Sequence, residues 1–433
     1  MFTTVSNIFK VADLRNKILF TLFVLLIYRI GAFIPVPGVN TELLKAAGQS
    51  GDNLFGLLNT FSGGALFNFS IFAIGIAPYI TASIIVQLLS MDVIPKFAEW
   101  AKQGEEGKKK LAQITRYGTV ILGLVQGTAT AIGFNNMFGV EILSDASFAD
   151  YIFVGIILTA GTAFLMWLGE QITERGIGNG ISILIFAAII AGIPGGIRVL
   201  YADLFGGAVD NMFLSVIKAV VIVLVVIAIV IGVIFVQQGI RKIPVQYAKR
   251  VVGRKMFGGQ STHIPMKVNG AGVIPVIFAI SLLLFPTTIA QFAGGKLWAT
   301  WIINNLQYDQ PLGAVLYVLL IIGFTFFYTF VQINPVQMAD QMKKNGGFIT
   351  GIRPGKPTEK YLTKVLTRLT LAGAIFLAVI SIFPVIFGGL AGLDRSIQLG
   401  GTSLLIVIGV ALDTMKQIEG QLMKRHYKGF INK

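Results

Sequence analysis

Apolar residues occur along this chain in long runs, which polar and basic segments separate. Ten of the runs are about 20 residues long, the length of a helix that crosses a hydrocarbon core of about 30 Å. The pattern predicts spans at residues 18–36, 71–91, 117–137, 151–170, 181–200, 213–236, 271–292, 312–333, 367–388 and 399–416. The first run is longer than the apolar part of a signal peptide, so we expect it to be retained as a span.

Charge predicts the orientation of these spans. Of the 35 Lys and Arg residues, all but six lie in segments on the same side as the amino terminus. The six are Arg29, Lys45, Arg198, Lys218, Lys296 and Arg395. The positive-inside rule therefore places both termini in the cytosol.

Residues 54–69 are also apolar, but glycines interrupt them and they are short for a span. If they crossed in addition to residues 71–91, the basic loop with Lys102 and Lys108 would face outward, against the charge rule. The stretch is therefore predicted to enter without crossing. Broken backbone at membrane depth requires shielding by protein or a water-filled cavity.

Composition supports an integral membrane protein. The chain is 55% hydrophobic and 13% charged, with mean hydropathy +0.77, whereas soluble domains carry about 25% charged residues. Runs of this length favour helices over the short alternating strands of a barrel. Because cysteine is absent, disulfides, thiolate metal sites and cysteine nucleophiles are excluded.

Two long basic loops, at 237–269 and 332–364, are expected on the cytosolic side. The first contains VQYAKRVV and THIPMKV around Gly258 and Gly259, which predicts a two-stranded ribbon. The second contains NPVQMADQMKKN, which predicts a short helix, and then a turn-rich segment. Attraction to anionic lipid explains basic loops in general, but the structured pattern favours docking of an anionic partner.

No catalytic motif is present. The two histidines, His263 and His426, lie in a loop and in the tail, and RGIGNG follows no predicted strand, so a tight turn is favoured over a phosphate loop. Arg29 and Asp413 are candidates for an ion pathway, but each lies near a span end. Ile76, Ile80 and Ile84 share one helix face, and spacing alone favours a lipid-facing stripe.

Five long motifs run nearly from end to end of the chain. They are NTFSGGALFNFSIFAIGIAPYITASIIVQLL, LGEQITERGIGNGISI, THIPMKVNGAGVIPVIFA, INPVQMADQMKKNGGFITGIRPGKPT and GGTSLLIVIGVALDT. In this order they closely resemble the SecY family of protein-conducting channels, bacterial type. The resemblance implies an all-α membrane protein of ten transmembrane helices in two pseudo-symmetric five-helix halves, residues 1–200 and 201–433, with a re-entrant plug helix within about 54–70.

The resemblance also implies the site residues. The pore ring falls on Ile76, Ile80, Ile181, Ile185, Ile277 and Ile406. The plug falls on Asn59, Thr60, Phe61, Ser62, Gly63, Gly64, Ala65, Leu66, Phe67 and Asn68. Because Ile181 and Ile185 lie at the cytosolic start of their span, the ring requires a funnel that brings this helix start inward.

A lateral gate is implied between the second and third spans and the seventh and eighth. Its positions are Ile84, Gln87, Asn269, Ser281 and Phe285. A weak polar contact between Gln87 and Asn269 is expected to hold it, and Pro78 and Pro275 are expected to bend the gate helices. Partner docking is implied for Arg241, Lys249, Arg250, Arg254 and Arg353.

The function that the resemblance implies is passage of unfolded secretory chains across the cytoplasmic membrane and release of apolar segments sideways into lipid. The implied partners are SecE, SecG, the motor ATPase SecA, ribosomes, signal peptides, unfolded polypeptides and anionic lipids. No enzyme activity, cofactor or metal is expected of the chain itself. The alternative is a secondary transporter for a small solute, which would require a polar site at the membrane midplane.

Overall fold

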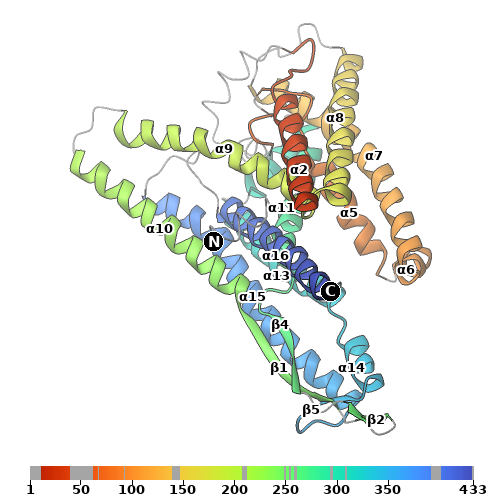
Figure 1. The fold of residues 1–433 in the computed structure, drawn as a ribbon. Coiled ribbons are helices and arrows are strands. Elements are labelled where there is room, and N and C mark those ends of the chain that lie inside the picture. The colour runs from red at the N-terminus through yellow and green to blue at the C-terminus, as the bar shows by residue number, and fades with distance from the viewer. Residues whose placement is uncertain are drawn as a thin grey trace.

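The computed structural model describes residues 11–39, 62–66, 68–91, 93–138, 147–206, 212–247, 250–252, 255–257, 261–292, 296–307, 310–391 and 401–431. Most of these residues are helical, and Figure 1 shows the few strands gathered at one end of the molecule. The predicted plug positions Asn59, Thr60, Phe61 and Phe67 lie outside the described residues, as do the docking positions Lys249 and Arg254.

Ten helices coincide with the ten predicted spans. They are α2 (Ala12–Gly31), α5 (Ala77–Leu89), α7 (Glu105–Phe138), α8 (Phe148–Arg175), α9 (Gly180–Phe205), α10 (Met212–Gln238), α11 (Ile274–Phe292), α13 (Pro311–Gln332), α15 (Lys356–Ala391) and α16 (Gly401–Ile431). Three shorter helices are α6 (Pro95–Lys102), α12 (Leu297–Asn305) and α14 (Pro335–Lys344). The strands are β1 (Ile240–Tyr247), β2 (Arg250–Val252), β3 (Lys255–Phe257), β4 (Ser261–Lys267) and β5 (Gly347–Ile349).

Length and apolar composition qualify six helical segments in the described part of the chain to cross a membrane. They are Glu105–Asn135, Phe148–Arg175, Gly180–Ala202, Ser215–Gln238, Pro311–Lys344 and Lys356–Pro384. Two shorter apolar helices, Ala77–Leu89 and Ile274–Ala290, accompany them. Several helices continue well past the predicted spans: α7 begins at Glu105, α15 at Lys356, and α16 extends to Ile431.

The ten helices that coincide with the predicted spans form two groups, and these groups contact each other along two lines of helix packing. In Figure 1, α2, α5, α7 and α8 gather on one side and α13, α15 and α16 lie on the other, with α11 near the junction. Helix α11 contacts α5 and α7 across one line, and α9 contacts α16 and α10 across the other. Because α8 contacts α9, α16 contacts α15, and α13 contacts both α15 and α11, these contacts close into a circuit around a centre.

Helix α5 begins later than the predicted span 71–91. Residues 71–76 form turns, and Phe69 just before them (φ 40°) and Gly75 within them (φ 62°) have positive φ angles. Pro78 lies in the first turn of α5, where the missing N–H of proline breaks no helical hydrogen bond. Pro275 is likewise the second residue of α11. The predicted bending at these two prolines is therefore wrong: both begin helices.

The two basic loops fold together. Strand β1 pairs antiparallel with β4, which confirms a ribbon, but β1 begins at Ile240, earlier than predicted. Residues 250–252, which were predicted to belong to its first strand, form β2 and pair with β3 instead. Helix α14 confirms the predicted short helix, and the Asn334 side chain caps it by accepting from the backbone N–H groups of Val336 and Gln337. Sequence did not predict β5, which pairs with β1 and so joins the second loop to the first.

The sheet β4-β1-β5 has its own apolar core. Ile243 and Val245 from β1, Met266 from β4 and Ile349 from β5 are buried against residues of α14 and α15, among them Met342 and Leu362. This packing fixes the sheet at the end of the long helix α15. The side of the molecule that carries the sheet and α14 is called the basic side below.

Candidate pore and gate

All six isoleucines of the predicted ring come together. They belong to one hydrophobic cluster, in which Ile76, Ile185, Ile277 and Ile406 are buried and Ile80 and Ile181 are partly buried. Ile76 is the N-cap residue of α5, and the others lie on α5, α9, α11 and α16, the helices through which the two groups contact each other. The structure thus places all six in one apolar cluster at the junction of the two groups.

The face that Ile76, Ile80 and Ile84 share does not face lipid. Ile84 is 2% exposed and Ile76 is 7% exposed, because α5 packs between α7 and α11. Ile85, the next residue after Ile84, is exposed instead. The lipid-facing stripe that spacing favoured is therefore wrong, since spacing gives the face that residues share but not what covers it.

A small cavity of about 50 Å³ lies within the cluster. Its lining includes Ile76, Ile80, Ile185, Ile277, Tyr28 and Ser62. This volume holds only a few waters, since one water needs about 10–15 Å³ on this measure. The lining of this cavity is largely apolar. An apolar constriction in a channel opposes the passage of hydrated ions by dewetting.

The described part of the predicted plug, residues 62–66 and 68, consists of turns that contact the cluster. Tyr28 Oη donates to the Ser62 carbonyl oxygen at 3.1 Å, and Arg29 Nη1 donates to the Gly63 carbonyl oxygen at 2.9 Å. Gly63 has φ +66°, and a Cβ there would lie 3.0 Å from the backbone of Ala188 on α9. Helix α2 therefore binds this segment by its backbone and holds it against α9.

Contacts with neighbouring segments explain the position of Arg29 without an ion pathway. Its guanidinium also lies 4.6 Å from the centre of the Phe33 ring, so an aromatic face and a carbonyl oxygen account for its position near the helix end. Sequence reasoning named Arg29 but missed Tyr28. The available signal was a pair of hydrogen-bonding side chains side by side at the end of an apolar run.

Aromatic side chains from α2 and α8 pack against the turn segment 69–76. The rings of Tyr28 and Phe72 are stacked with centres 6.0 Å apart, and those of Phe72 and Phe164 with centres 6.1 Å apart. Thr162 Oγ1 donates to the Gly75 carbonyl oxygen at 3.1 Å. The backbone that leads into α5 is thus held between α2 and α8, a contact that no sequence motif indicated.

A larger, polar cavity of about 460 Å³ opens on the basic side of the cluster. We name it the entrance cavity; its lining includes Asn179, Gln237, Asn269, Val273, Val410 and Asp413. Asn179 caps α9, while Ile185, less than two turns later, lines the small inner cavity. The entrance cavity and the inner cavity thus lie near opposite ends of the first two turns of α9.

Of the predicted gate residues, Ile84 and Gln87 lie on α5 and Ser281 and Phe285 on α11, two helices in contact, whereas Asn269 lies in the β4–α11 connection. Ile84 and Ser281 are buried, Phe285 is partly buried, and Ser281 lines the inner cavity. The expected contact between Gln87 and Asn269 is not formed in the described structure. Gln87 Nε2 donates to Ser83 Oγ at 3.1 Å, and Asn269 Nδ2 donates to the Gly272 carbonyl oxygen at 3.0 Å, so each amide is bonded within its own segment.

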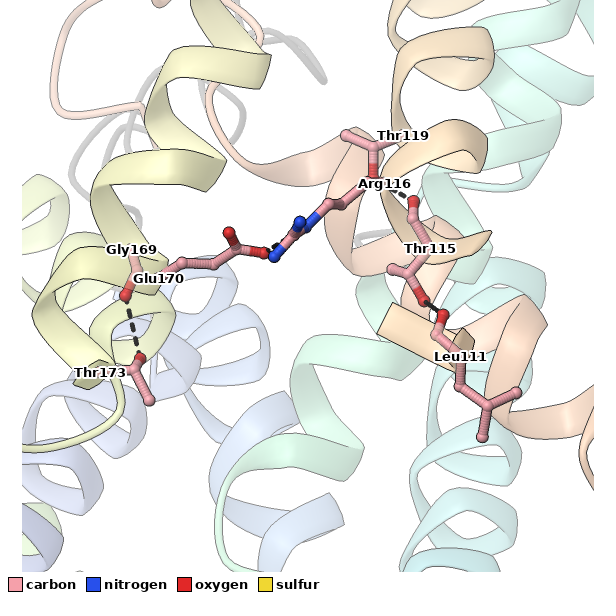
Figure 2. Close-up of polar contacts among 7 residues, drawn as sticks. All are labelled: Leu111, Thr115, Arg116, Thr119, Gly169, Glu170 and Thr173. Atoms are coloured by element: carbon pink, nitrogen blue, oxygen red, sulfur yellow. Dashed lines mark hydrogen bonds and ion pairs between the residues drawn. The ribbon is translucent and has the colours of Figure 1, made fainter. Parts of the chain in front are cut away.

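An ion pair joins α7 to α8 beside this contact. Figure 2 shows Arg116 of α7 extending toward Glu170 of α8, and Arg116 Nε lies 2.8 Å from Glu170 Oε1. The two side chains are 50% and 25% exposed. In both helices threonines bond back to the carbonyl one turn earlier, as Thr115 does to Leu111 and Thr173 to Gly169.

The docking residues lie on the sheet and beside it. Arg241 is exposed on β1 and Arg353 is exposed in the turn after β5, so the pairing of β1 with β5 places both on one folded unit. Arg250 lies on β2, but its side chain is outside the described residues. Within the described part of the chain, no group of three His, Cys, Asp or Glu residues could hold a metal ion.

This fold and site define a class: a helical membrane protein whose two helix groups meet at an apolar cluster with a small cavity inside it. The SecY family model matches residues 70–415. The "Protein translocase subunit SecY" of Halalkalibacterium halodurans is 60% identical over 432 residues and that of Bacillus subtilis is 57% identical over 431, each covering 100% of both chains. The chain therefore belongs to the SecY family. This membership does not support the alternative of a small-solute transporter.

Solved structures of channels share the fold. "The structure of a protein conducting channel" gives TM-score 0.62 at 19% identity, covering 93% of this chain and 91% of that one. A SecY structure, whose plug domain is described as maintaining a membrane seal, gives 0.60 at 20% identity with the same coverage. Sec61 in a canine ribosome-channel complex gives 0.56 at 17% identity, again with the same coverage.

Proposed function

We propose that the chain is the central pore subunit of a Sec translocon. It passes unfolded secretory polypeptides across the cytoplasmic membrane and releases transmembrane segments through a lateral gate. The observation that carries this proposal is that six isoleucines from both helix groups belong to one apolar cluster, and that four of them line a small cavity together with Ser62. Curated relatives named as protein translocase subunits support it.

In this proposal the ring residues Ile76, Ile80, Ile181, Ile185, Ile277 and Ile406 close around a passing chain without offering ions a hydration site. Residues 59–68 act as the plug and leave the constriction when a polypeptide enters. The gate is the contact of α5 and α7 with α11 and α13, and Ile84, Gln87, Asn269, Ser281 and Phe285 lie along it. A signal peptide competes with these contacts and separates the helices.

The two helix groups correspond to the halves 1–200 and 201–433 in this proposal. Motion between them opens the gate on one line, while the contact of α9 with α16 and α10 serves as the hinge. The apolar contacts along the gate line are the kind that an apolar signal helix replaces at little cost.

The chain itself is proposed to be a channel and not an enzyme. Energy then comes from the motor ATPase SecA, from a translating ribosome or from the membrane potential, and SecE and SecG are the proposed membrane partners. Arg241, Lys249, Arg250, Arg254 and Arg353 supply cations for an acidic protein face or RNA phosphates. The termini and the basic side face the cytosol, where anionic lipids add about 1 kcal/mol of attraction per Lys or Arg.

The experiment is reconstitution of the full chain with SecE and SecG in lipid vesicles, with SecA and ATP outside. An unfolded secretory precursor should become protected from added protease, and protection should require ATP. A vesicle that takes up small solutes and never protects the precursor would contradict the proposal.

A further inference from the structure

Helix α12 connects the ends of α11 and α13 that lie away from the basic side. Helix α11 begins shortly after β4 and α13 ends shortly before α14, so one end of each helix is on the basic side. Their other ends are joined through α12, which packs on α11 and also contacts α13. Because α11 and α13 are apolar helices of a membrane protein, α12 lies where these two helices leave the membrane.

The residues of α12 fall on three sides of the helix, since successive helical residues are about 100° apart. The side toward the protein is buried or partly buried and consists of Ala299, Ile302 and Ile303. The exposed surface has two flanks. We call one the apolar flank, which consists of Leu297, Trp298 and Trp301, and the other the polar flank, which consists of Thr300 and Asn304.

The apolar flank is far too exposed for a helix surrounded by water. Leu297 is 92% exposed, Trp301 is 55% exposed and Trp298 is 48% exposed, whereas a helix on a soluble protein turns such residues toward the core. Helix α13, which α12 contacts, also exposes Leu312 and Val315 in its first two turns. Exposed apolar residues on two contacting helices at the same end of the molecule indicate one continuous surface covered by lipid.

The residue types on α12 indicate the depth at which it meets the lipid. Tryptophan is enriched where the headgroups meet the acyl chains, because its ring is largely apolar and its N–H is polar. Lys296, the N-cap residue, is exposed, and a lysine at this place holds its stem on apolar surface and its ammonium among lipid phosphates. Asn305 Nδ2 donates to the Trp301 carbonyl oxygen at 2.9 Å, so this amide is bonded within the helix itself.

We propose that α12 is an interfacial lipid-binding helix in the leaflet opposite the basic side. Its apolar flank inserts into the boundary between headgroups and acyl chains, and its polar flank faces water. Interfacial helices bury their apolar surface about 5–10 Å into this boundary. The partner is the lipid surface, and α12 thereby holds the adjoining ends of α11 and α13 at a fixed depth. This inference goes beyond the proposed function, since it concerns neither the ring nor the docking residues.

The test measures the depth of Trp301 by fluorescence quenching in the full chain, reconstituted in phosphatidylcholine vesicles. The chain has four tryptophans, so phenylalanine at positions 100, 167 and 298 leaves Trp301 as the only one. The vesicles contain a lipid with a nitroxide either on its headgroup or near the end of its acyl chain. We expect the headgroup nitroxide to quench Trp301 at least roughly twofold more strongly than the chain-end nitroxide.

A reporter inside the membrane calibrates this comparison. Leu224 is exposed near the middle of α10, so Leu224→Trp, in a chain whose native tryptophans are all replaced by phenylalanine, should show the reverse order of quenching. Thermal unfolding of each variant in detergent checks that the fold is retained.

Variants on the two flanks assign the lipid contact to the apolar one. With Trp301 as the reporter, Leu297→Asn together with Trp298→Asn should weaken quenching by the headgroup nitroxide and raise quenching by iodide in the water by roughly twofold. The matched control is Thr300→Ser together with Asn304→Ser on the polar flank, which should leave both values unchanged. All four positions are exposed, so the Tm should stay nearly constant in both pairs.

Three results would overturn the proposal. Strong quenching of Trp301 by iodide with little quenching by either lipid would show that the apolar flank faces water. Weak quenching by lipid and by iodide alike would show that protein covers it, such as a second copy of this chain. Stronger quenching by the chain-end nitroxide would place α12 within the hydrocarbon core. The assay contains no precursor, so its outcome is independent of precursor protection.

Discussion

At the scale of single residues, we expect the seal to depend on apolar side chains at the proposed ring and on the two hydrogen bonds from α2 to the segment 62–66. The family resemblance located all six isoleucines, and the structure brings them into one cluster. Periodicity alone placed the α5 isoleucines toward lipid, because a helical pattern has no information on which neighbours cover a face. The contacts of Tyr28 with Ser62 and Phe72 join segments far apart in sequence and had no local signal.

Polar substitution in the ring should make the channel leak. Burying an asparagine amide there without partners costs about 1–3 kcal/mol, and hydration of the constriction removes that cost. We expect Ile80→Asn with Ile277→Asn to raise ion flux through reconstituted vesicles by roughly tenfold or more. Ile85→Asn is the matched control, since Ile85 lies on the exposed face of the same helix; equal leak from the control would remove the ring assignment.

Weakening the bonds of α2 to the segment 62–66 should also raise the leak, with the ring intact. A hydrogen bond from a charged donor contributes about 1.5–3 kcal/mol, so Arg29→Gln should increase the open population by roughly tenfold or more. Tyr28→Phe should have a smaller effect. Conductance of single channels in a planar bilayer measures this, with Arg198→Gln on the exposed face of α9 as control; unchanged open time in Arg29→Gln would contradict the assignment.

At the scale of elements, apolar runs predicted the ten helices that coincide with the spans, and local sequence patterns predicted α14 and a ribbon in the first basic loop. Two features were out of reach. The late start of α5 follows from the positive φ angles of Phe69 and Gly75, and Phe69 is not a residue type that marks such a turn. Strand β5 has only three residues and exists because β1 offers it an edge.

The ion pair between α7 and α8 is expected to couple these helices weakly. Because Arg116 is half exposed, solvent screens the pair and its coupling energy should be about 0.2–1 kcal/mol. A double-mutant cycle of Arg116→Gln and Glu170→Gln, read by thermal unfolding in detergent, measures this coupling. It should decrease in high salt, and a coupling of zero at low salt would show that the contact contributes no stability.

The turn after β5 is expected to dock the motor. Arg353 is exposed there, and its carbonyl oxygen accepts from Thr358 Oγ1 at 2.8 Å, which holds the turn in place. Arg353→Glu should abolish precursor protection driven by SecA while leaving the Tm unchanged. Lys344→Glu, with the same charge change on exposed α14, should retain most activity; full export by Arg353→Glu would remove the docking assignment.

At the scale of the whole molecule, the ring lies where the two helix groups meet, on α5 and α11 along one line and on α9 and α16 along the other. Charge asymmetry predicted the orientation and the non-spanning segment, and the family resemblance predicted the order of helices. The entrance cavity followed from neither, because it is formed by the end of α10, the β4–α11 connection, the start of α9 and the middle of α16. The entrance cavity forms only when these segments pack together, so no single stretch of sequence indicates it.

The most direct test of the central claim uses the absence of cysteine in this chain. Single cysteines are placed at Ile80, Ile277 and Ile406, and at Ile85, which is exposed on α5, as the control. Each variant is paired with a precursor that carries one cysteine and is stalled halfway through the membrane. The account predicts disulfide crosslinks from the stalled chain to the three ring positions and none to Ile85. Crosslinks to Ile85 alone, or to no ring position while the precursor spans the membrane, would contradict it.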